Sequence, residues 1–253
     1  EGNYHNTLGR FDQYLMPYLQ SDLDAGRETP ETALALVEAF FLACNRDSDL
    51  YPGVQQGDNG QSLVLGGMEP VTDDAGLLDF LKKRRGLLDG VAITGGEPLL
   101  RRELPALLRS IKELGYAVKL DTNGSHPEAL RAVVATGLVD YVAMDVKNSP
   151  VRYADTVGLP DFDPAPVVES AAFLLGGAVD YEFRTTAVAE LHDDQSFRDI
   201  GRWLAGARRY FIQCFVQRDT VPCRELHPPE KAQLERWAEL VQPWIPSVAL
   251  RGV

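Results

Sequence analysis

Cysteine is scarce in this sequence. Its 253 residues contain only Cys44, Cys214 and Cys223, and no two of them form a Cys-x-x-Cys clip. A sparse, odd set of this kind argues against a disulfide-built secreted protein and favours a reducing cytoplasm. Long apolar runs are also missing, because no segment reaches the roughly 20 residues that cross a bilayer.

Positive charge is in short supply. Lys and Arg number 25 against 37 Asp and Glu, which gives a formal net charge of −12 at pH 7. Non-specific nucleic-acid binding and polybasic membrane anchoring both need the opposite balance, so the composition argues against them. Residues 1–65 contain no lysine. This uneven distribution predicts a divergent acidic segment over residues 1–62 and a regular domain over residues 63–253.

From residue 73 onward, β-rich runs alternate with amphipathic helical runs, which predicts βαβ units and a parallel sheet. The predicted strands are 90–94, 117–121, 139–145, 180–186, 209–215 and 247–251, and the predicted helices are 77–88, 104–114, 127–136, 166–175, 195–205 and 229–241. Earlier in the chain, Thr29-Pro30 predicts the capped start of a helix that runs to about Phe41. The fold class is therefore α/β, and the pattern leaves a doubly wound sheet, a full barrel and a partial barrel open.

Charged or amide side chains follow five successive predicted strands. The carboxyl ends of parallel strands meet at one edge of a sheet, so we expect these side chains to converge. The set is Glu97, Asp121, Asp145, Lys147, Arg184 and Gln213. Any one of them could simply be a polar strand end, and Asn123-Gly124 suits a plain turn. Gly95-Gly96 lets the backbone approach a ligand closely, because no Cβ intervenes.

Three ordered motifs resemble those of the radical S-adenosylmethionine (SAM) superfamily. They are Thr94-Gly95-Gly96-Glu97-Pro98, Leu120-Asp121-Thr122-Asn123-Gly124 and Met144-Asp145-Val146-Lys147. The later motifs, with 180–186 and 248–253, are similar to the activating-enzyme branch. The resemblance implies a partial (β/α)6 barrel of radical SAM type over about residues 63–253. The implied SAM-binding residues are Gly95, Gly96, Glu97, Pro98, Asp121, Thr122, Asn123, Asp145, Lys147, Arg184 and Gln213, and Lys147 is also an implied catalytic residue.

The same resemblance implies a [4Fe–4S] cluster, held by three thiolates in a Cys-x3-Cys-x2-Cys loop, that cleaves SAM reductively. The resulting radical takes a hydrogen atom from a glycine of a partner glycyl-radical enzyme, such as anaerobic ribonucleotide reductase. Flavodoxin or ferredoxin is the implied electron donor. Cys44 matches the first cluster ligand and is an implied catalytic residue, but the next two positions are Ser48 and Tyr51. Neither is a good iron ligand, so the residues predict that the usual cluster is not held.

Three alternatives stay open. In the first, the chain is a non-catalytic homologue that binds SAM, a nucleotide or the partner enzyme. In the second, it is a barrel enzyme in which Glu97, Asp121 and Asp145 hold a divalent ion such as Mg²⁺ or Mn²⁺. In the third, residues 1–62 are altered while residues 63–253 follow the family. A cluster held jointly by all three cysteines is disfavoured, because metal-ligating cysteines are normally closely spaced.

Overall fold

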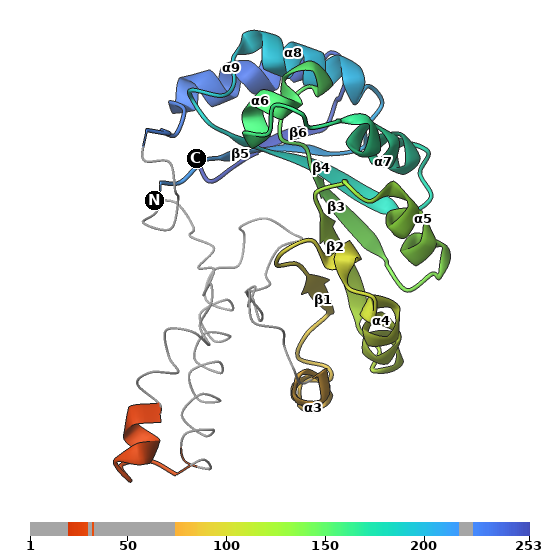
Figure 1. Cartoon of the computed structure of the whole chain (residues 1–253), viewed down its shortest axis with the longest axis vertical. Coiled ribbons are helices and arrows are strands. Elements are labelled where there is room, and N and C mark those ends of the chain that lie inside the picture. Colours follow the sequence, from red (N-terminus) through yellow and green to blue (C-terminus); the bar gives the residue numbers. More distant parts are fainter. Residues whose placement is uncertain (1–19, 30–31, 33–73, 218–224) are drawn as a thin grey trace. The chain divides into compact units, whose positions relative to one another are not determined.

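The chain divides into two compact units, Glu1–Asp74 and Ala75–Val253. The computed structural model describes residues 20–29, 32, 74–217 and 225–253 (Figure 1). In the first unit, residues 20–24 are helical, and Arg27 forms an ion pair with Asp22 at 2.6 Å. Most of the helix predicted to end near Phe41 lies outside the described residues, as does Cys44. Of the helices that are described, none has the length and apolar content to cross a membrane.

The second unit is built on six parallel strands that pair in chain order. They are β1 (Gly90–Ile93), β2 (Ala117–Thr122), β3 (Tyr141–Asp145), β4 (Asp180–Ala187), β5 (Tyr210–Cys214) and β6 (Val248–Arg251). A doubly wound sheet reverses its strand order at a switch point, and this sheet does not. The curved, unclosed sheet in Figure 1 is therefore a partial barrel. All six predicted strands are confirmed, each to within two residues at either end.

Six helices lie close to their predicted positions. They are α3 (Asp74–Lys83), α4 (Leu104–Glu113), α5 (Pro127–Ala135), α7 (Ala165–Leu175), α8 (Asp194–Trp203) and α9 (Lys231–Val241). Helix α3 ends earlier than predicted, and three residues later Gly86 has a φ of 78°, a conformation that does not continue a helix. The short elements η1 (Pro98–Leu100), η2 (Pro150–Arg152) and α6 (Tyr153–Val157) were not predicted. Both η2 and α6 follow β3, at the edge where the site is expected.

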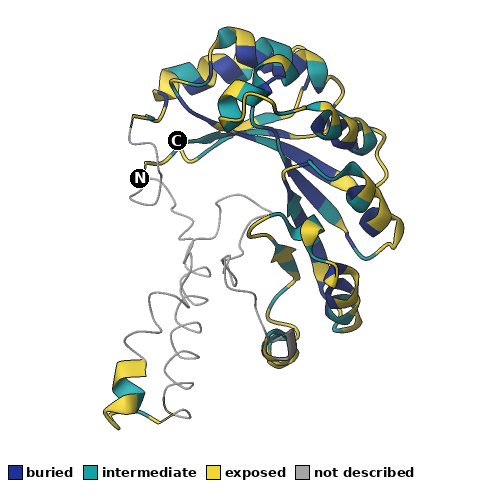
Figure 2. Cartoon of the chain, in the orientation of Figure 1, coloured by how far each residue is buried: buried dark blue, intermediate teal, exposed yellow. Residues whose placement is uncertain are grey.

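The two faces of the sheet differ in chemistry. Helices cover the convex face (Figure 1), and the side chains between helices and sheet form the buried core (Figure 2). Leu120, Val142 and Phe183 are fully buried there. Successive residues of a strand point to opposite faces, so the neighbours Asp121 and Glu182 belong to the other, concave face. The sheet therefore presents its polar residues on the side that no described helix covers.

Candidate functional site

The loop after β1 is tied to the end of β2 through Glu97. The Glu97 carboxylate accepts hydrogen bonds from the Thr122 hydroxyl at 2.9 Å, the Asn123 amide at 2.7 Å and the Leu99 amide at 3.2 Å. Just before it, Gly95 has a φ of 120°, and a Cβ at that position would meet no atom within 4 Å. Glu97 thus fixes a loop whose glycine backbone is open to a ligand.

Four charged side chains from neighbouring strand ends form what we call the mouth cluster: Asp121, Asp145, Lys147 and Arg184. Arg184 bridges the two aspartates, with Nε 2.9 Å from Asp145 Oδ1 and Nη1 3.3 Å from Asp121 Oδ2. Lys147 Nζ lies 3.3 Å from Asp145 Oδ2. Burial alone would lower the pKa of Arg184, but the two aspartates outweigh it and raise that pKa. The predicted convergence of these four residues is confirmed by their contacts.

One oxygen of the mouth cluster has no hydrogen-bond partner among the described residues. Asp121 Oδ1 is buried, and its ion-pair partner Lys119 Nζ lies 3.8 Å away, beyond hydrogen-bond distance. A buried carboxylate oxygen without a donor is costly, unless a ligand supplies one. SAM carries suitable donors in its ammonium group and its ribose hydroxyls. The acceptor that the site offers therefore fits the donors of SAM.

A second charged group, the inner cluster, lies deeper on the concave face. It consists of Lys119, Tyr141, Glu182 and Arg251. The buried Glu182 carboxylate accepts two bonds from Arg251, at 3.1 and 3.2 Å, one from Tyr141 at 3.1 Å and one from Lys119 at 3.4 Å. Burial alone would raise the pKa of Glu182, but Arg251 and Lys119 lower it overall.

The inner cluster was not predicted from the sequence, although a signal for it was present. Lys119 and Glu182 lie within strands, two positions before the predicted residues Asp121 and Arg184. The period of two in a strand places both members of each pair on one face. Gln213, the last predicted convergent residue, lies on the same concave face, where it is the register partner of Arg251.

The described residues do not fit an iron–sulfur cluster. Cys214 is the one cysteine among them, since Cys44 and Cys223 lie outside. Its thiol donates weakly to the Phe215 carbonyl at 3.5 Å, and partial burial raises its pKa, which disfavours the thiolate that iron needs. Within the described parts of the chain, no three His, Cys, Asp or Glu side chains are grouped to hold a metal.

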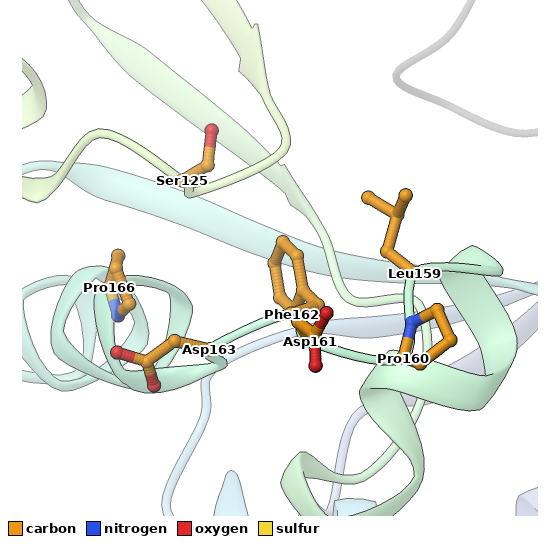
Figure 3. Close-up of a pocket in the computed structure, with 7 residues that line it drawn as sticks. All are labelled: Ser125, Leu159, Pro160, Asp161, Phe162, Asp163 and Pro166. Carbon is orange, nitrogen blue, oxygen red and sulfur yellow. The ribbon is translucent and has the colours of Figure 1, made fainter.

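A cavity of about 490 Å³ is lined by residues outside the two charged clusters (Figure 3). It is lined by Ser125, Leu159, Pro160, Asp161, Phe162, Asp163 and Pro166. None of the predicted site residues is among them. Its lining is mainly apolar, and its two charged residues, Asp161 and Asp163, are acids, which would repel a ligand carboxylate.

Comparison with known proteins identifies the class to which this open α/β barrel belongs. Residues 64–175 match the family model of the radical SAM superfamily. A protein of Methanocaldococcus jannaschii, named as a candidate glycyl-radical enzyme activating enzyme, is 30% identical over 183 residues, or 70% of this chain and 74% of that protein. The chain belongs to the radical SAM superfamily, as a relative of its glycyl-radical enzyme activating enzymes. A solved domain of a pyruvate-formate lyase-activating enzyme from Bacteroides vulgatus shares the fold, with a TM-score of 0.54 at 14% identity over 64% of this chain and 99% of that domain.

The beginning of the chain matches a different family. Residues 1–76 match a pyruvate formate lyase-like family model, and Cys44 lies inside that match. The isethionate sulfite-lyase of Oleidesulfovibrio alaskensis is 33% identical over 87 residues, which is 30% of this chain and 10% of that enzyme. The radical SAM match begins only at residue 64. The two family matches therefore meet between residues 64 and 76, close to the boundary between the two compact units.

Proposed function

We propose that the barrel unit binds SAM at the mouth cluster, as an activating enzyme of glycyl-radical enzymes would, and that these 253 residues do not cleave it reductively. The observation that carries the first half is Asp121 Oδ1, a buried acceptor that receives no hydrogen bond from any described residue and lies in an arginine-bridged pair of aspartates. The second half rests on the cysteine content, because three closely spaced thiolates are absent from the sequence.

Each end of SAM has a complementary group in this proposal. The ammonium group binds near the open backbone of Gly95 and Gly96, beside the loop that Glu97 fixes. Lys147, whose side chain is 40% exposed and pairs with Asp145, supplies the cation for the carboxylate. Arg184 is 13% exposed and already bridges two aspartates, so it orders the site. Asp121 Oδ1 accepts a hydrogen bond from the ribose.

The cluster of the family would supply the electron that breaks SAM, and the residues present do not fit it. We therefore assign no redox step to this chain and no electron donor. The divalent-metal alternative gains no support either. Arg184 lies between Asp121 and Asp145, Glu97 is bonded to Thr122 and Asn123, and no described trio of ligands is grouped for a metal.

We further propose that residues 1 to about 74 descend from a glycyl-radical enzyme and not from the cluster loop of an activating enzyme. The pyruvate formate lyase-like match over residues 1–76 supports this origin. On this interpretation Cys44 is not the first cluster ligand, and its agreement with the expected position is a coincidence. The chain then joins a piece of a glycyl-radical enzyme to the barrel of an activator. Its partner class remains a glycyl-radical enzyme; anaerobic ribonucleotide reductase and a cytoplasmic location stay predictions.

Calorimetric titration of the full chain with SAM, without iron, tests the binding proposal. We expect one SAM per chain, and we expect Asp121→Asn to weaken binding about tenfold, because it removes the charge that the ligand donors face. Asp163→Asn, which alters the cavity of Figure 3, is the matched control and should leave the affinity unchanged. Absence of binding, or a larger effect of Asp163→Asn, would overturn the site.

Anaerobic reconstitution with iron and sulfide tests the second half of the proposal. We expect substoichiometric, loosely held iron. About four irons per chain that survive gel filtration would show that a cluster is held after all. Replacing Cys44 by Ser would then show whether that residue is a ligand.

A further inference from the structure

A buried histidine contacts the backbone of one mouth-cluster residue, Lys147. His192, in the connection between β4 and α8, is 3% exposed. Its Nε2 lies 2.8 Å from the Lys147 carbonyl, which can only accept, so Nε2 carries a proton and donates to it. Its Nδ1 lies 3.1 Å from the Val188 amide and 3.2 Å from the Val188 carbonyl, and in the neutral ring it accepts from the amide. His192 thus links the β4–α8 connection to the backbone of the mouth-cluster lysine.

The backbone of Lys147 is held from both sides. Its amide donates to the Tyr153 hydroxyl at 3.2 Å, and its carbonyl accepts from His192. Burial raises the pKa of Tyr153 to about 12, so that hydroxyl stays protonated near neutral pH. The next residue, Asn148, donates to the Leu191 carbonyl at 3.0 Å. These bonds fix the backbone position from which the Lys147 side chain extends to Asp145.

We propose that His192 is a positioning residue for SAM: by holding the Lys147 carbonyl, it keeps the Lys147 ammonium beside Asp145, ready for the carboxylate of the ligand. The inference rests on the proposed SAM-binding function. Burial lowers the pKa of His192, which favours the neutral ring that this geometry needs. The charged groups that face the ring are Arg152 and Asp193, which pair with each other at 2.7 Å. Phe197 packs against the ring with centroids 5.6 Å apart.

Two variants separate the two hydrogen bonds of the ring. In His192→Gln, the side-chain amide nitrogen takes the place of Nε2 and can still donate to the Lys147 carbonyl. In His192→Asn, the side-chain oxygen takes the place of Nδ1 and can accept from Val188, but the bond to Lys147 is lost. Both substitutions disturb the same buried position, so each variant serves as the other's control for a loss of stability. Their melting temperatures should be compared before binding is measured. We expect His192→Asn to weaken SAM binding about tenfold and His192→Gln to weaken it at most twofold.

The same pair of variants is then measured in a Lys147→Met background. If His192 acts through Lys147, His192→Asn has no further effect on SAM affinity there. An unchanged tenfold effect in that background, or equal losses for the Asn and Gln variants, would overturn the proposal.

Hydrogen exchange without ligand keeps this test separate from the binding proposal. We expect faster amide exchange over residues 146–149 in His192→Asn than in His192→Gln, with residues 123–126 unchanged. Failure of the wild-type chain to bind SAM would overturn the proposed function, while the exchange data would still decide whether His192 holds the lysine segment. Equal exchange over residues 146–149 in both variants would overturn the role of His192.

Discussion

Glu182 of the inner cluster and Asp121 of the mouth cluster share a neighbour, Lys119, but differ in how well they are satisfied. Glu182 accepts four hydrogen bonds from three residues. Asp121 has one buried oxygen to which no described residue donates a hydrogen bond. A buried carboxylate with a donor on each oxygen is part of the framework, whereas one with an oxygen that lacks a donor can accept a hydrogen bond from a ligand. The comparison predicts that substitutions in the two clusters affect different properties, stability in one and binding in the other.

The largest effect is expected from removing the buried carboxylate. Glu182→Ala should lower the free energy of unfolding by about 3 kcal/mol, because Lys119 and Arg251 lose their shared partner. Both cations are partly exposed, which keeps the loss at the low end of the range for buried pairs. Chemical denaturation measures it, with Glu182→Gln as the control that preserves volume. Equal stability of wild type and Glu182→Ala would contradict the framework role.

At the mouth cluster, binding should change and stability should not. Lys147→Met should weaken SAM binding about tenfold, since it removes the proposed cation for the ligand carboxylate. Lys112→Met is the matched control, because Lys112 pairs with Asp140 at 2.8 Å away from the carboxyl edge. Calorimetry and thermal unfolding should be run on both variants. If Lys112→Met lowers the affinity as much as Lys147→Met, the effect is one of net charge and not of the site.

Much of the fold could be predicted because its signals are local. The apolar spacing of Leu104, Leu107, Leu108 and Ile111 predicted a helix with one buried face, and all four are buried in α4. The β-rich runs likewise predicted every strand. Local signals did not choose between a doubly wound sheet and a barrel, because that choice depends on which strands pair. The resemblance indicated the barrel, and the strand order confirmed it.

The site could be predicted only in part, for a related reason. Strand-end residues such as Asp121 and Arg184 could be grouped by the rule for parallel sheets, and they do meet. The bond between Glu182 and Arg251 joins β4 to β6 across an intervening strand, so it depends on register and sheet curvature. The support of Lys147 by His192 depends on a connection that has no repeating pattern.

Acid pH should weaken the inner cluster selectively. Glu182 has a lower pKa in the folded chain than its ordinary value of 4.5. Such a group stabilises the fold above its unfolded pKa, and this contribution is lost as the pH falls through the folded value. The melting temperature of the wild-type chain should therefore fall more steeply below pH 4.5 than that of Glu182→Gln. If the melting temperatures of the two proteins fall in parallel with pH, the pKa of Glu182 is the same in the folded and unfolded chain, and the prediction is wrong.

The smallest effect is expected at an ion pair with good geometry but no burial. Arg131 and Glu169 link α5 to α7 with a separation of 2.5 Å, and their side chains are 43% and 49% exposed. Exposed pairs contribute roughly 0–1 kcal/mol, because water competes for both charges and ordering two long side chains costs entropy. Arg131→Ala should therefore change the free energy of unfolding by less than about 0.5 kcal/mol, judged by chemical denaturation beside Glu182→Ala. If Arg131→Ala and Glu182→Ala lower the free energy of unfolding by similar amounts, burial does not set the contribution of these ion pairs. Pairing geometry would then be the deciding factor.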